Sequence, residues 1–185
     1  MSSHQILFLS ANMKDYSGAM YQQDVIDEIK KQFNVFFYGP GFHNYNPDDS
    51  IYEILNKSNK RIKAIVLGHS CLSDNKNSKA IMSFGKFDLR KTNLPKIAIL
   101  NKEYVNVERK LNFLKTNNFD LCFTHHHEFQ KYENLTNIKF IFWPFATSSS
   151  LLQNKKRLKE IDIGFSGTLK NQNFNQSDLR IKIMH

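Results

Sequence analysis

Three side chains that can move protons follow apolar runs of this sequence, at points where β-strands would end. His69 follows "IVLG", Glu103 follows "AILNK" and His125 follows "LCFT". Imidazole and carboxylate groups act as general bases when their pKa suits the task, and they also hydrogen-bond to hydroxyl groups. We treat these residues as candidates for a catalytic base or for contact with an acceptor substrate. The competing interpretation is that each caps a helix or hydrogen-bonds to its own loop.

The histidine run does not have the pattern of a metal centre. In "THHHE" (124–128) neighbouring side chains diverge, so the three imidazoles cannot all reach one ion. The chain has neither HExxH nor a second cluster of histidine and cysteine. Cys71 and Cys122 lack CxxC spacing and each follows an apolar run, which favours reduced, buried thiols. We therefore expect no metal and no cofactor.

A single glycine marks the loop after the first apolar run. Gly18 in "SANMKDYSGAM" stands where a helix would begin, and helix N-termini attract anions and hydroxyl-rich ligands. The loop matches neither GxGxxG nor GxxxxGK[ST], and GxSxG is absent from the chain. Gly18 is thus a candidate substrate contact, with an ordinary turn as the alternative, and the sequence does not support hydrolase chemistry.

The elements that must position these residues follow a strand and helix rhythm. Apolar runs alternate with helix-like stretches, which is typical of βα units in a parallel sheet. Helical spacing of apolar residues is clear over 21–33 and 107–114, and Ser50 with Glu53 forms a capping box. The sequence predicts an α/β fold with a doubly wound, mainly parallel Rossmann-like sheet and helices on both faces. The expected strands are 6–12, 35–41, 64–70, 96–103, 120–125 and 139–145. Ligands of such sheets bind at the carboxyl ends of the strands.

The composition narrows the function classes. The 185 residues are 41% hydrophobic, which suits a packed core, and they carry a net charge of +9. Positive charge attracts polyanions, but the lysines are scattered and no RNP, zinc-finger or basic-region signature occurs. We therefore expect no nucleic-acid partner. No apolar run approaches the ~20 residues of a membrane helix and no signal peptide opens the chain, which predicts a cytoplasmic protein without a transmembrane segment.

The texture of the sequence changes after "FIFWPFA". The polar, serine-containing stretch 147–160 is typical of a linker, and "IDIGFSGT" (161–168) then begins a new strand-like run. We expect a Rossmann-like domain over 1–146, a linker over 147–160 and the start of a second domain over 161–185. An isolated strand at 161–168 would leave backbone groups unpaired, which predicts self-association through it.

This tail resembles a junction in GT-B fold glycosyltransferases, particularly those similar to the spore protein CgeB and to family 1 enzymes. In those proteins the N-terminal half ends near a Trp-Pro or Leu-Pro strand, and the second half opens on a strand, a glycine turn and a helix with an arginine. The residues that stand in the corresponding places are Lys159, Asp162, Gly164, Phe165, Gly167, Thr168 and Arg180. The motif detail covers 143–180, and the βα rhythm covers most of the chain.

The resemblance implies the N-terminal, acceptor-side half of a metal-independent glycosyltransferase. Such an enzyme transfers a sugar from a nucleotide-sugar donor to a hydroxyl of a sugar or glycan acceptor. Gly167, Thr168 and Arg180 are then substrate contacts at the start of the donor domain. Because the second domain begins only at 161, we expect the chain to be inactive alone. The rival hypothesis is a standalone flavodoxin-like or receiver-like α/β ligand-binding or interaction module, in which 161–167 is the last strand of the one sheet.

Overall fold

The computed structural model divides the chain into two units, Met1–Leu151 and Leu152–His185. The described residues all belong to the first unit, and they are 4–12, 14, 20–72, 88–103 and 105–144. Several predictions fall outside them: the linker, the strand at 161–168, and the candidate contacts Gly18, Gly167, Thr168 and Arg180.

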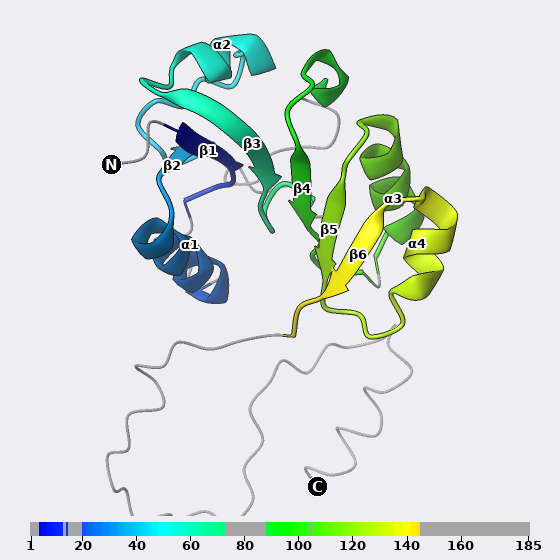
Figure 1. The fold of residues 1–185 in the computed structure, drawn as a ribbon. Coiled ribbons are helices and arrows are strands. Elements are labelled where there is room, and N and C mark those ends of the chain that lie inside the picture. The colour runs from blue at the N-terminus through cyan, green and yellow to red at the C-terminus, as the bar shows by residue number, and fades with distance from the viewer. Residues whose placement is uncertain (1–3, 13, 15–19, 73–87, 104, 145–185) are drawn as a thin grey trace, which may run out of the picture. The chain divides into compact units, whose positions relative to one another are not determined.

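One all-parallel sheet organises the described part of the chain, with the strand order β2-β1-β3-β4-β5-β6 (Figure 1). Its strands are β1 (His4–Leu9), β2 (Val35–Tyr38), β3 (Arg61–Leu67), β4 (Lys96–Ile99), β5 (Leu121–Thr124) and β6 (Lys139–Phe142). Each expected strand is present, and the parallel α/β, Rossmann-like arrangement is confirmed. Each strand ends one to four residues earlier than predicted, because the described residues that follow it belong to loops at the carboxyl edge.

Helices connect these strands in the order expected of βα units. They are α1 (Met20–Gln32), α2 (Ile51–Asn56), the 3₁₀ helix η2 (Leu89–Lys91), α3 (Val107–Thr116) and α4 (Gln130–Thr136). The capping box at the start of α2 is confirmed, because Ser50 Oγ accepts from the Glu53 N–H while the Glu53 carboxylate accepts from the Ser50 N–H.

Phe33 does not continue the apolar stripe of the first helix, as its spacing from Ile29 had suggested. α1 ends at Gln32, and Phe33 is 56% exposed. Steps of four residues advance a side chain by about 40° around a helix, so a long series of such steps leaves the buried face. The residues that α1 buries are instead Gln22 and Ile26.

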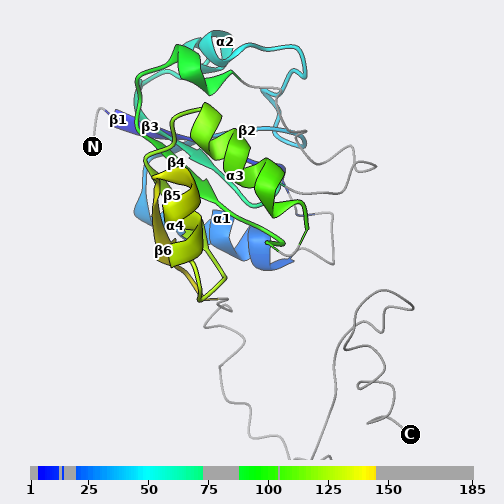
Figure 2. The same cartoon turned by 90° about the vertical axis from the view of Figure 1, so that its right-hand side faces the viewer.

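The helices lie on both faces of the sheet, as predicted. Alternate residues of β1 point to opposite faces: Phe8 packs in a cluster with Ile26 of α1, whereas Leu7 and Leu9 pack in a larger cluster with α2 and α3. Figure 2 turns α3 and α4 toward the viewer. None of the helices in the described stretches combines the length and apolarity needed to cross a membrane.

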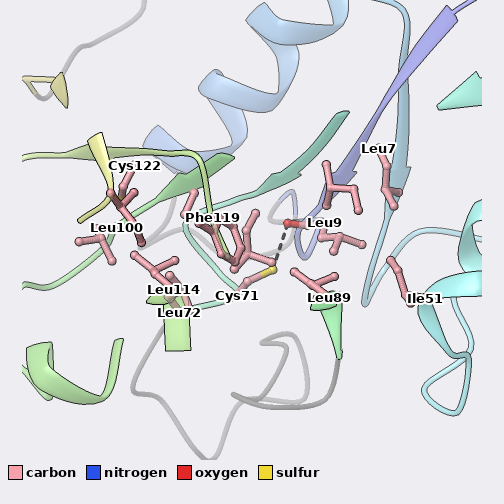
Figure 3. Packing of buried hydrophobic residues seen from close by; sticks show 14 of the residues in the cluster. Leu7, Leu9, Ile51, Cys71, Leu72, Leu89, Leu100, Leu114, Phe119 and Cys122 are labelled. Atoms are coloured by element: carbon pink, nitrogen blue, oxygen red, sulfur yellow. Dashed lines mark hydrogen bonds between the residues drawn. The ribbon is translucent and has the colours of Figure 1, made fainter. Parts of the chain in front are cut away.

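Both cysteines belong to the larger cluster (Figure 3). Cys71 and Cys122 are buried and are not joined in a disulfide, which confirms the expectation of reduced, buried thiols. The Cys71 thiol donates to the Leu9 carbonyl over 3.0 Å, and burial raises its pKa to about 12. The thiol therefore acts as a small packing group and not as a nucleophile.

Candidate functional site

Two histidines meet at the carboxyl edge of the sheet. His69 lies just beyond β3 and His125 follows directly on β5, and the order of the strands places only β4 between them. The Nε2 atoms of the two rings are 3.3 Å apart, and the ring planes differ by 12°. Parallel strands end at a common edge, so residues far apart in the sequence come together there. We call these residues the histidine pair.

A glycine lets the chain reach the histidine pair. A Cβ atom on Gly68 would lie 2.7 Å from Cε1 of Phe8 and 3.1 Å from Cβ of Ser10, so a larger residue would require the Phe8 ring to move. The glycine thereby leaves room for the Phe8 ring directly before His69.

A backbone carbonyl sets the protonation of His125. Its Nδ1 lies 2.6 Å from the Trp143 carbonyl oxygen, and a carbonyl only accepts, so Nδ1 carries the proton. In the neutral ring Nε2 is then unprotonated, and it accepts the N–H of His69 Nε2 across the 3.3 Å contact. His125 therefore presents a basic nitrogen at the edge of the sheet.

Glu103 holds the backbone of His125 in place. Its Oε1 accepts from the Thr124 hydroxyl at 2.8 Å and from the His125 N–H at 2.9 Å. The Glu103 side chain is buried and Thr124 is fully buried. One carboxylate thus ties the loop after β4 to the end of β5, and His125 enters its loop from a fixed position.

His69 is kept uncharged by its surroundings. Burial, and secondarily the neighbouring His125, lowers the pKa of His69 from 6.5 to about 3. His69 therefore stays neutral at neutral pH, and its Nε2–H faces Nε2 of His125.

Aromatic side chains line the pair. The half-buried Trp143 ring lies 5.9 Å from the His69 ring and 6.2 Å from the His125 ring, measured between centroids. Phe123 packs edge-on against Trp143 at 5.4 Å. The imidazoles consequently sit against an apolar wall that limits the approach of water from that side.

A lysine supports the loop that carries Glu103. Lys110 of α3 is fully buried, and its Nζ donates to the carbonyls of Asn101 and Lys102 at 2.8 and 2.9 Å. The sequence held a signal for this residue, because Lys110 stands between Val107 and Leu114 on the predicted apolar stripe of the helix. A lysine on a buried stripe needs polar partners.

Two serines contact each other at the same carboxyl edge. Between β1 and β3, where the direction of strand addition reverses, Ser10 Oγ lies 3.0 Å from Ser70 Oγ. Ser70 Oγ also accepts the Ala11 N–H at 2.7 Å. These side chains bind one another, so the Ala11 N–H is already engaged within the protein.

The structure brings together the three described candidates from the sequence: His69 and His125 touch, and Glu103 holds His125. The other two histidines of the run leave the pair, since His126 packs on the Tyr132 ring at 5.7 Å and stacks with His127 at 5.2 Å. Within the described stretches, no group of three His, Cys, Asp or Glu side chains is arranged to hold a metal ion. The contribution of the Trp143 carbonyl had no signal in the sequence, because it belongs to the backbone.

Comparison of the chain with models of protein families, with curated proteins and with solved structures finds no match.

Proposed function

We propose that the described unit is the acceptor-side half of a GT-B type glycosyltransferase. The observation that carries the proposal is the 3.3 Å contact between the Nε2 atoms of His69 and His125 at the ligand-binding edge of a parallel sheet. The tail motif over 159–180 supports the same class. An acceptor hydroxyl must lose a proton as it attacks, and an oriented imidazole is the commonest group for that task.

His125 is the proposed base. An acceptor hydroxyl replaces His69 as the donor to His125 Nε2, and it gives up its proton as its oxygen attacks the anomeric carbon of the donor sugar. The new C–O bond forms while the bond from the anomeric carbon to the diphosphate oxygen breaks, and the diphosphate leaves with that electron pair. The Trp143 carbonyl, 2.6 Å from Nδ1, keeps the ring in place during the transfer.

The surrounding residues have supporting roles in this proposal. Glu103 positions His125 by accepting a hydrogen bond from the backbone N–H of His125. The uncharged His69 hydrogen-bonds to the base between turnovers. We propose that Gly18 contacts the acceptor. The donor is a nucleotide-sugar, for which we propose contacts from Gly167, Thr168 and Arg180. The reaction needs no metal or cofactor. The reduced thiols of Cys71 and Cys122 favour a reducing compartment such as the cytoplasm, and we retain self-association through 161–168 as part of the proposal.

A binding experiment tests the proposal. The ¹⁵N-labelled 185-residue chain is titrated with a panel of mono- and oligosaccharides and of nucleotide-sugars, and NMR shifts are followed. We expect millimolar saccharide to shift the imidazole signals of His69 and His125 and the Trp143 indole signal. His125→Asn should abolish these shifts, whereas His127→Asn, which changes an exposed histidine of the same loop, should keep them. A panel that moves none of these signals would overturn the proposal.

One observation favours the rival binding module. The order of the first five strands, β2-β1-β3-β4-β5, is that of flavodoxin-like sheets, in which FMN binds beside β1 and β3. At that place the Ala11 N–H is engaged by Ser70 and is not offered to a phosphate. FMN added in the same titration decides between the two: shifts at Ala11 and Ser70 without shifts at the histidine pair would support the module.

A further inference from the structure

The buried ammonium of Lys110 lies next to the loop that leads to the site. Lys110 has no exposed surface, although a buried ammonium is costly unless its donors are satisfied. Two of its hydrogen bonds go to consecutive carbonyls, those of Asn101 and Lys102. A buried lysine that binds backbone carbonyls fixes the path of the chain, so the question is what that path controls.

The path of this loop is one that L-residues rarely take. Lys102 has φ of 52° and Asn106 has φ of 50°, both in the left-handed region. Such conformations persist only where the surroundings hold them, and they gather at functional sites. Lys110 donates to the carbonyl of Lys102 itself, so the ammonium stabilises the strained residue directly.

The residue after this strained position is Glu103. Fixing the Lys102 carbonyl fixes the peptide from which Glu103 departs, and the Glu103 carboxylate then reaches the Thr124 hydroxyl and the His125 N–H. Two sets of hydrogen bonds, joined by the covalent link between Lys102 and Glu103, therefore connect α3 to His125 through the loop after β4. The connection ends at the Trp143 carbonyl, 2.6 Å from His125 Nδ1.

The tautomer of His125 depends on that last contact. A neutral imidazole in water prefers the proton on Nε2, whereas His125 carries it on Nδ1 because of the Trp143 carbonyl. A small displacement of the His125 backbone would lengthen this bond and release the ring to the ordinary tautomer. We infer that Lys110 is a positioning residue, whose hydrogen bonds to the loop after β4 hold His125 in the Nδ1–H tautomer through Glu103. The inference rests on the proposed function only for the chemical use of the pair.

Long-range ¹H–¹⁵N spectra of the histidine rings test this inference on the 185-residue chain, with the ring signals assigned by single His→Asn variants. The variant is Lys110→Met, which keeps the stem and removes the donors. Its control is Lys115→Met, the same change at an exposed position of the same helix. We expect the wild type and Lys115→Met to show the Nδ1–H pattern for His125. Lys110→Met should lose that pattern while keeping the circular dichroism of the folded chain. A folded Lys110→Met chain with the wild-type pattern would overturn the inference.

A second pair of variants decides the matter if Lys110→Met does not fold. Glu103→Gln retains an oxygen that accepts from Thr124 and His125, so we expect the Nδ1–H pattern to remain. Glu103→Ala removes that acceptor, and the pattern should be lost. If Glu103→Ala preserves the pattern, the route from Lys110 through Glu103 is wrong. No substrate is present in these spectra, so they test the role of Lys110 alone. The saccharide titration tests the transferase proposal separately.

Discussion

Two polar networks lie beyond the carboxyl ends of the strands, and they are built on different principles. After β2, the Asp49 carboxylate accepts hydrogen bonds from the Tyr38 hydroxyl and the Lys57 ammonium. Beyond β3 and β5, two imidazoles face each other across 3.3 Å. The first network joins opposite charges, whereas the second joins two bases, of which His69 is uncharged at neutral pH.

This difference separates a structural network from the one that we propose to be reactive. In the first, Lys57 also donates to the Asn44 carbonyl and lies 5.6 Å above the Tyr38 ring, and the Asn46 N–H donates to the Tyr38 oxygen. The donors and acceptors of this network hydrogen-bond to one another, and these bonds hold the loop between β2 and α2 in place. In the histidine pair, the unprotonated Nε2 of His125 lies against a second base, His69. We propose that a ligand hydroxyl replaces His69 as the donor to this nitrogen.

The largest effect is expected when the pair is broken by acid. His69 has a pKa of about 3 in the folded protein and 6.5 ordinarily, so protons bind the unfolded chain more tightly. The free energy of unfolding should therefore fall as the pH drops below about 6.5, by up to about 1.4 kcal/mol per pH unit. Urea unfolding between pH 7.5 and 4.5 measures this slope. His69→Asn should flatten it and His127→Asn should not, and equal slopes in all three chains would contradict a buried, neutral His69.

The charged network is broken most directly at Tyr38. Tyr38→Phe removes a buried hydroxyl that binds Asp49, the Asn46 carbonyl and the Asn46 N–H. We expect a loss of about 2 kcal/mol in the free energy of unfolding, since the ring still fills its site and only the hydrogen bonds are lost. Tyr52→Phe is the matched control. Its exposed hydroxyl binds the Lys91 carbonyl, and its loss should cost within about 0.5 kcal/mol.

A smaller change sharpens the role of Glu103 beside the histidine pair. Thr124→Val removes the hydroxyl that donates to Glu103 at 2.8 Å and accepts the His126 N–H at 3.1 Å. Denaturant unfolding should show a loss of about 1 kcal/mol, because the carboxylate keeps its bond to the His125 N–H. Thr124→Ser retains the hydroxyl and should lie closer to the wild type. The reverse order of the two variants would show that packing of the methyl group, and not the hydroxyl, dominates at this position.

The sequence predicted the sheet and the edge at which the candidates lie, since apolar runs and parallel strands follow from local pattern. His69, Glu103 and His125 were found through one rule, that ligands bind beyond the carboxyl ends of such strands. The order of the strands decides which of these residues touch. The sequences of β3, β4 and β5 do not predict that order.

Other parts of the site could not be predicted because they are made by the backbone or by long-range packing. The Trp143 carbonyl orients His125, yet no side chain signals it. Tyr38 and Asp49 are separated by eleven positions in a region without helical spacing, so their contact needed the folded loop. Lys110 is the intermediate case: its place on an apolar stripe indicated burial, but not which carbonyls it binds.

The smallest expected effect separates the two networks along the pH axis. Hydrogen bonds from Lys57 and then Tyr38 lower the pKa of Asp49 below its ordinary value of 3.8. Its stabilising contribution is therefore present above pH 3.8 and is lost as the pH falls through the folded pKa, whereas the effect of His69 already begins near pH 6.5. The effect is modest because the Lys57 side chain is 35% exposed and solvent screens the pair.

The variant Asp49→Asn tests this expectation, because it keeps an acceptor for Tyr38 but has no charge to titrate. The difference between wild type and Asp49→Asn in the free energy of unfolding should stay constant from pH 7 to pH 5 and narrow toward pH 3. If the difference already narrows between pH 7 and pH 5, a histidine is responsible for the acid sensitivity of the Asp49 network. The Asp49 network and the histidine pair would then not differ in their pH dependence.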